Sequence, residues 1–120
     1  MKPYLHSKIH AKKFGGKPED YADIDDFIDS SKAAVADVRH RAALHSAFGC
    51  FIVEKVFGRT RINSDGKEYS PRDVAENHIL QDLGIIPTLE MYLNNMQIQG
   101  WMSGTEKHNV KKSKHIPLID

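Results

Sequence analysis

The sequence predicts a mainly α-helical fold, a small helical bundle around a long central helix with one short β-hairpin. Apolar residues recur at helical spacing in several segments, and glycine and proline stand where those segments should end and begin. One Asp-Gly turn lies between two short strand-like runs. The chain has 120 residues, of which 40% are hydrophobic and 28% charged, so it fits a single globular domain.

The first third of the chain is expected to hold two short helices. Residues 2–14 have the pattern of an amphipathic helix that ends at Gly15-Gly16, where glycine permits a left-handed cap. Residues 19–29 carry six acids and no base, with apolar residues at helical spacing among them. We therefore expect the second helix to have a strongly acidic outer face.

The central helix is predicted over residues 32–57, because Asp29, Ser30 and Ser31 supply N-cap residues and apolar side chains recur along the segment. Gly58 should end this helix.

After the central helix, residues 59–69 predict a small hairpin with its turn at Asp65-Gly66. Ser70 and Pro71 then give a strong helix start that Gly84 matches as a stop, and residues 87–93 indicate one more helix.

Composition limits the classes of function and the compartment. We expect one helical domain over residues 1–102 and a basic, flexible tail over 103–120. No stretch approaches the length of an apolar membrane span and no signal-peptide core is present, so we expect a cytoplasmic protein that does not contact membranes. The single cysteine, Cys50, lies in an apolar run and is interpreted as a buried hydrophobe. A net charge of +1 argues against broad capture of nucleic acid.

Histidines and acids recur at helical spacing on three of the predicted helices, so each helix could present a pair on one face. Imidazole and carboxylate are ligands of Zn, Mn, Fe and Ni, and facing helices of a bundle can deliver them inward. Taken singly, each pair is also explained by exposed side chains or by a helix end. Together they predict a site for a divalent transition metal with the ligands His6, His10, Asp37, His40, His45, His78 and Asp82.

Arginines and glutamates near these histidines suggest a substrate that carries phosphate. Guanidinium groups bind phosphate oxygens in a bidentate manner, so Arg39, Arg41 and Arg72 are the predicted substrate-binding residues. The alternative is that they pair with the acids of residues 19–29. Glu54 or Glu76 is the predicted general base or ligand-orienting partner, and Arg41 would also stabilise charge that develops on phosphate.

Several motifs, taken as a set, resemble a family of small bacterial and phage proteins of unknown function. They are HxxxH from His6, FGGKPEDY from Phe14, DSSKA from Asp29, RHRA from Arg39, NSDG from Asn63, and ExH from Glu76 that continues to DLGIIP. The resemblance spans residues 4–102 and implies that the polar residues and glycine turns belong to one site. A fainter likeness is to helical phosphohydrolases with a His-Asp dipeptide, but no adjacent His-Asp pair occurs here.

Three functions remain open from the sequence. The first is a metal-dependent hydrolase of a phosphate ester or phosphodiester, such as a nucleotide or cyclic nucleotide. The second is a non-catalytic phage or bacterial protein that binds or sequesters a nucleotide, with an oligomer interface completing its pocket. The third is a buried polar network that only fixes helix packing.

Overall fold

The computed structural model describes residues 1–104 and confirms a mainly helical fold with one hairpin. The antiparallel pair aligns Arg61 with Tyr69 and Ile62 with Glu68. Positions 105–120 of the predicted tail lie outside the described residues. The elements are α1 (Pro3–Phe14), α2 (Ala22–Ile28), α3 (Arg41–Leu44), α4 (Ala47–Phe57), β1 (Arg61–Ile62), β2 (Glu68–Tyr69), α5 (Pro71–Leu83) and α6 (Leu89–Leu93), with 3₁₀ turns at Pro18–Asp20, Ser30–Ala33, Val38–His40 and Gly100–Ser103.

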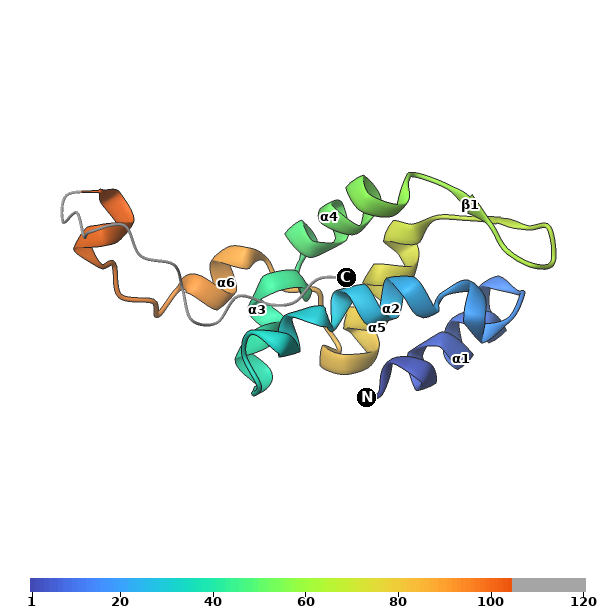
Figure 1. The fold of residues 1–120 in the computed structure, drawn as a ribbon, viewed down its shortest axis with the longest axis horizontal. Coiled ribbons are helices and arrows are strands. Elements are labelled where there is room, and N and C mark those ends of the chain that lie inside the picture. Colours follow the sequence, from blue (N-terminus) through green and yellow to red (C-terminus); the bar gives the residue numbers. More distant parts are fainter. Residues whose placement is uncertain (105–120) are drawn as a thin grey trace.

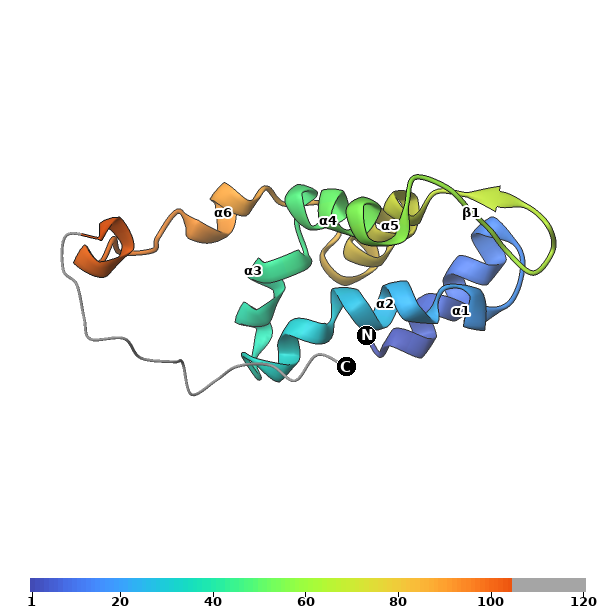
Figure 2. The same ribbon diagram turned by 45° about the horizontal axis from the view of Figure 1, so that its top comes forward.

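Helix α5 occupies the centre of the body and contacts α1, α2 and α4 (Figure 1). The hairpin lies at one end of this body, whereas α6 and the Gly100–Ser103 turn extend away from the other end (Figures 1 and 2). The apolar core is small and lies among α2, α4, α5 and β2. It consists of Tyr21, Ile24, Ile28, Cys50, Val53, Tyr69, Val74, Ala75 and Ile79.

Helix α5 begins and ends as the sequence predicts. The Ser70 hydroxyl accepts a hydrogen bond from the Asp73 amide at 3.2 Å, and Pro71 occupies the first turn, where its missing N–H costs nothing. Gly84 follows the last turn with φ +74°, a left-handed conformation that favours glycine. These caps fix the position at which the last turn of α5 presents its side chains.

The single long helix predicted over residues 32–57 is wrong. The segment instead forms two 3₁₀ turns, α3 and α4, with breaks where Asp37 and Ser46 cap new turns with their side chains. His45 has φ −87° and ψ +57°, which is not helical, and Ser46 is extended. A side chain at Gly49 would collide with the backbone of Leu44, so glycine lets α4 turn back closely against α3.

A polar clasp joins the hairpin to the connection between α1 and α2. The buried Asn63 amide donates to the carbonyl of Phe14 at 3.1 Å and to the hydroxyl of Tyr21 at 3.3 Å, while its oxygen accepts from the Asp65 and Lys67 amides at 3.0 Å each. The Gly16 amide donates to the Asp65 carboxylate at 2.8 Å. The FGGKPEDY and NSDG motifs are therefore two halves of one structural contact.

Two further expectations from composition can be compared with the structure. Cys50 is buried, as predicted, and burial raises the pKa of its thiol to about 11. Among the helices of residues 1–104, none is both long enough and apolar enough to cross a membrane.

We expect Asn63→Ala to lower the free energy of unfolding by about 2–3 kcal/mol, because buried partners of the amide lose their hydrogen bonds. Urea denaturation followed by circular dichroism measures the change. Asn95→Ala is the matched control: Asn95 is exposed, and its replacement should change stability by less than about 0.5 kcal/mol. Equal stability of the two variants would contradict the clasp.

Candidate metal centre

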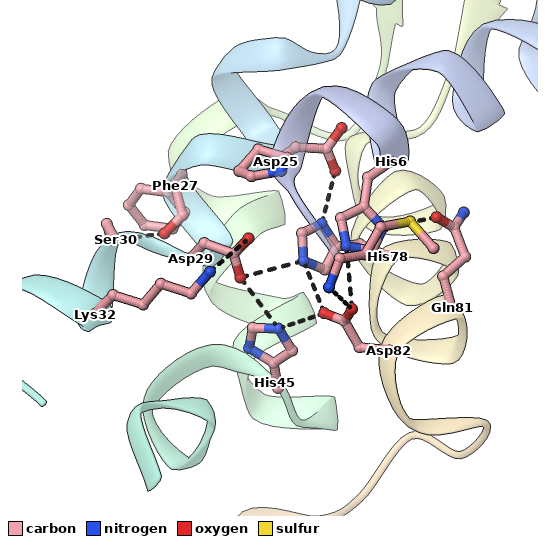
Figure 3. Close-up of polar contacts among 12 residues, drawn as sticks. His6, Asp25, Phe27, Asp29, Ser30, Lys32, His45, His78, Gln81 and Asp82 are labelled. Atoms are coloured by element: carbon pink, nitrogen blue, oxygen red, sulfur yellow. Dashed lines mark hydrogen bonds and ion pairs between the residues drawn. The ribbon is translucent and has the colours of Figure 1, made fainter. Parts of the chain in front are cut away.

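A cluster of buried imidazoles and carboxylates lies where α1, α2, α5 and the α3–α4 break meet (Figure 3). No member of this cluster has a side chain more than 7% exposed. Such burial of titratable groups is favourable only when they are paired or bind an ion. The members are His6, His10, Asp25, Asp29, His45, His78 and Asp82.

Local structure directs each of these side chains inward. His6 and His10 are one turn apart on α1, and His78 and Asp82 have the same relation on α5. Asp25 lies on α2, and Asp29 is the first residue after that helix. His45 occupies the break between α3 and α4, so the same interruption that ends the predicted long helix brings its ring to the cluster.

Four donor atoms from Asp29, His45, His78 and Asp82 lie close together. His45 Nε2 is 3.4 Å from Asp29 Oδ1 and 3.1 Å from Asp82 Oδ2. His78 Nε2 is 3.4 Å from Asp29 Oδ1 and 3.3 Å from Asp82 Oδ2, and all four atoms lie within 4.8 Å of one another. A tetrahedral ion with ligands at about 2.0–2.2 Å has edges of about 3.3–3.5 Å. The spacing thus fits a small divalent cation.

Asp25 belongs to a second, shorter set of contacts. His78 Nδ1 donates to Asp25 Oδ1 at 2.8 Å, and His10 Nε2 donates to the same oxygen at 2.9 Å. The Ser7 hydroxyl donates to the other oxygen at 2.7 Å. These lengths are those of charge-assisted hydrogen bonds, about 2.7–2.9 Å, rather than of edges around a metal. Asp25 therefore orients His78, so that Nε2 of His78 faces the four-donor site.

His6 is held at the edge of the four-donor site. Its ring stacks on the His78 ring, with centroids 3.7 Å apart, and its Nδ1 donates to the Gln81 side-chain oxygen at 2.6 Å. Gln81 in turn donates to Asn77. Nε2 of His6 then carries a lone pair and lies 3.2 Å from Asp82 Oδ1. A cation shared by both oxygens of Asp82 would meet His6 as a further ligand.

The pKa shifts within the cluster show how its buried imidazoles and carboxylates affect one another. Burial lowers the pKa of His6, as does the charge of His78. Burial opposes the charge of His78 too, but hydrogen bonds to Asp25 and Asp29 outweigh it and raise the pKa of His78 to about 9. Burial would raise the pKa of Asp29, yet its contacts with His45 and His78 hold it well below the usual range. Three carboxylates are buried together in this cluster, and a divalent cation would offset their negative charge.

The structure gathers five of the seven predicted ligands and separates the other two. His40 is buried, but its Nδ1 donates to the Ser31 hydroxyl at 3.0 Å, and its ring meets the edge of the His45 ring. Asp37 is exposed and binds the Arg39 side chain, so it is not a ligand here. The predicted stripe from Asp37 to His45 fails because the helix that would carry it is broken.

The predicted arginines and glutamates are also separated. The Arg39 side chain is 81% exposed, and its guanidinium forms an ion pair with Asp37. Arg72 and Glu54 pair with each other at 3.9 Å, and Glu76 lines a different cavity of about 220 Å³. None of these four side chains bonds to the cluster within the described part of the chain. Among the three predicted arginines, Arg41 is the one whose Nε is buried without a hydrogen-bond partner in the described part of the chain.

Two members of the cluster, Asp25 and Asp29, are absent from the sequence prediction. Both were assigned to an acidic outer face of the second helix, yet Asp25 is fully buried, while Asp23 and Asp26 are the exposed acids. The signal was present in the spacing, because positions 25 and 29 share a face with the core residue Ile28 and stand one turn apart. The exposed acids beside these two positions made the whole segment resemble a solvent-facing acidic helix.

The fold and the cluster define a small helical protein with a buried histidine and aspartate centre. The chain belongs to a family described as Domain of unknown function (DUF6915), whose model matches residues 1–102. No curated protein and no solved structure matches the chain.

Zinc should bind to protein from which metal has been removed with a chelator, at one ion per chain. At free zinc a hundredfold above Kd, binding should stabilise the fold by about 2.7 kcal/mol, seen as a raised Tm. His45→Gln should abolish both effects while circular dichroism shows that the helices remain. Asp37→Asn serves as the control and should bind zinc like the unaltered protein; equal loss in both variants would contradict the assigned ligands.

Asp25→Asn should keep the zinc stoichiometry and weaken affinity by about 10–100-fold, because His78 loses the carboxylate that orients it. Competition with a chromophoric chelator measures the affinity. The matched control is Asp26→Asn, which alters the adjacent exposed acid of α2 and should leave affinity unchanged. If Asp25→Asn removed the ion altogether, Asp25 would be a ligand and not an orienting residue.

Proposed function

We propose that this protein is a cytoplasmic metal-dependent hydrolase that cleaves a phosphate ester or phosphodiester, with nucleotides and cyclic nucleotides among its candidate substrates. The observation that carries the proposal is the set of four buried donor atoms from Asp29, His45, His78 and Asp82, which all lie within 4.8 Å of one another. A divalent cation there would lower the pKa of a coordinated water towards 7 and polarise a phosphoryl oxygen.

The remaining chemistry would come from side chains of the centre. Asp29 Oδ2 is buried without a hydrogen-bond partner, with Lys32 Nζ 3.8 Å away, so it is the carboxylate oxygen available to take a proton from water. The water oxygen then forms the new bond to phosphorus, and the bond from phosphorus to the ester oxygen breaks. The departing oxygen takes up the proton, which yields an alcohol and a phosphate. This assignment replaces Glu54 and Glu76 as candidate bases.

Arg41 would stabilise the charge that develops on phosphate. It lines a cavity next to the centre, and the amide of His45 donates to the Arg41 carbonyl at 2.8 Å. Its buried Nε has no hydrogen-bond partner among residues 1–104, which is the condition in which a guanidinium gains most from an anionic ligand.

A second function is favoured by one specific feature of the site. Four protein ligands would fill all positions of a four-coordinate ion, and closed four-ligand sites are typical of structural metals, whereas catalytic sites keep a position open. In that case the protein would bind or sequester a nucleotide without turnover. Hydrolysis would require the ion to bind a water in addition to its protein ligands, as zinc does where its coordination expands to five.

Protein loaded with zinc or manganese should release nitrophenolate from 4-nitrophenyl phosphate or from bis(4-nitrophenyl) phosphate, and a nucleotide panel run beside them should identify the preferred ester. Asp29→Asn should lower kcat by about 100-fold or more, because Asp29 is both a proposed ligand and the proposed proton acceptor. Asp26→Asn should retain full activity.

The outcome that rejects hydrolysis is a fully loaded protein that cleaves none of these esters. Recovery of an intact, stoichiometrically bound nucleotide from that preparation would establish the second function.

A further inference from the structure

A cavity of about 390 Å³, a volume suited to one small organic molecule, is lined by residues connected to those of the candidate centre. Three of its lining residues are joined by a peptide bond or a hydrogen bond to a residue that is a proposed ligand. Leu83 follows Asp82 on α5, the His45 amide donates to the Arg41 carbonyl, and the Tyr92 hydroxyl donates to the His45 carbonyl at 2.8 Å. The lining comprises Val38, Arg41, Leu83, Ile85, Pro87, Met91 and Tyr92.

The lining combines one cation with an otherwise apolar wall. Of its seven side chains, only those of Arg41 and Tyr92 have polar atoms, and the Tyr92 hydroxyl already donates its hydrogen to His45. Arg41 Nε is buried without a partner, which is costly unless a ligand supplies an acceptor. Ile85 and Met91 are 54% and 58% exposed, so the wall lacks an apolar cover on that side.

We propose that this cavity binds a phosphate monoester whose alcohol part is apolar or aromatic. The phosphate would accept hydrogen bonds from the Arg41 guanidinium, and the apolar part would lie against Leu83, Ile85 and Met91. Beyond Arg41 and the Tyr92 oxygen, the wall offers no side-chain partner for the hydroxyl groups of a sugar or the edges of a base, so among the candidate esters this cavity disfavours nucleotides. As a statement about substrate the inference rests on the proposed hydrolase function, but the binding itself does not require metal.

Binding is tested with phenyl phosphate as the probe, by NMR or calorimetric titration of the full chain after chelator treatment. Phenyl phosphate should bind at least about tenfold more tightly than inorganic phosphate, because the ring buries apolar surface. Arg41→Met should weaken phenyl phosphate binding by about tenfold or more, since it removes the charge and keeps the length of the side chain. Ile85→Ser should weaken phenyl phosphate about fivefold and leave inorganic phosphate unchanged.

Matched controls use the exposed residues Arg59 and Ile62. Arg59→Met and Ile62→Ser remove the same groups far from the lining and should bind phenyl phosphate like the unaltered protein. Equal affinity for phenyl phosphate and inorganic phosphate, or indifference to Arg41→Met and Ile85→Ser, would overturn the inference.

The two proposals fail in different ways. If phenyl phosphate binding shows the expected dependence on Arg41 and Ile85 but the protein takes up no metal, the cavity assignment stands and the hydrolase function does not. If metal-loaded protein hydrolyses esters while Arg41→Met and Ile85→Ser change neither binding nor KM, the hydrolase function stands and the cavity assignment is rejected.

Discussion

The packing of α1, α2 and α5 depends on one requirement, that seven buried titratable side chains satisfy one another. Each helix contributes a group that the others need: His78 of α5 and His10 of α1 both donate to Asp25 of α2. Breaking such a buried pair costs about 3–5 kcal/mol, yet apolar residues in its place are often as stable or more so. A cluster of this kind gives little advantage as scaffolding beside a nine-residue apolar core, and the proposed ion would give it a second role.

Two local devices hold this cluster in shape. At one end, the Asn63 clasp fixes the hairpin to the turn between α1 and α2, and so sets where α2 begins relative to α1. At the other end, the break at His45 turns one imidazole inward and starts α4 on the side of α5. The last turn of α5 serves two purposes, because Asp82 faces the carboxylate and imidazole cluster while Leu83 lines the neighbouring cavity.

Elements with their own caps could be predicted from the sequence. Ser70, Pro71 and Gly84 fixed α5 to the residue, and Asp65-Gly66 located the hairpin, because these signals act within a few residues. The central helix was mispredicted because the apolar periodicity continues across Ser46. No signal in the neighbouring sequence indicates that the backbone at Gly49 approaches that of Leu44. In the site, same-helix pairs such as His78 and Asp82 were found. Asp25 was not, because its partners lie 15 and 53 residues away along the chain.

Those long separations also determine when the centre forms during synthesis. His6 bonds to Gln81, 75 residues later, and Asp25 bonds to His78, 53 residues later. At a synthesis rate of about 5–20 residues per second, roughly 3–10 s pass between the synthesis of Asp25 and that of His78. The centre therefore cannot form before α5 has been made, and no N-terminal fragment that ends before α5 can contain it.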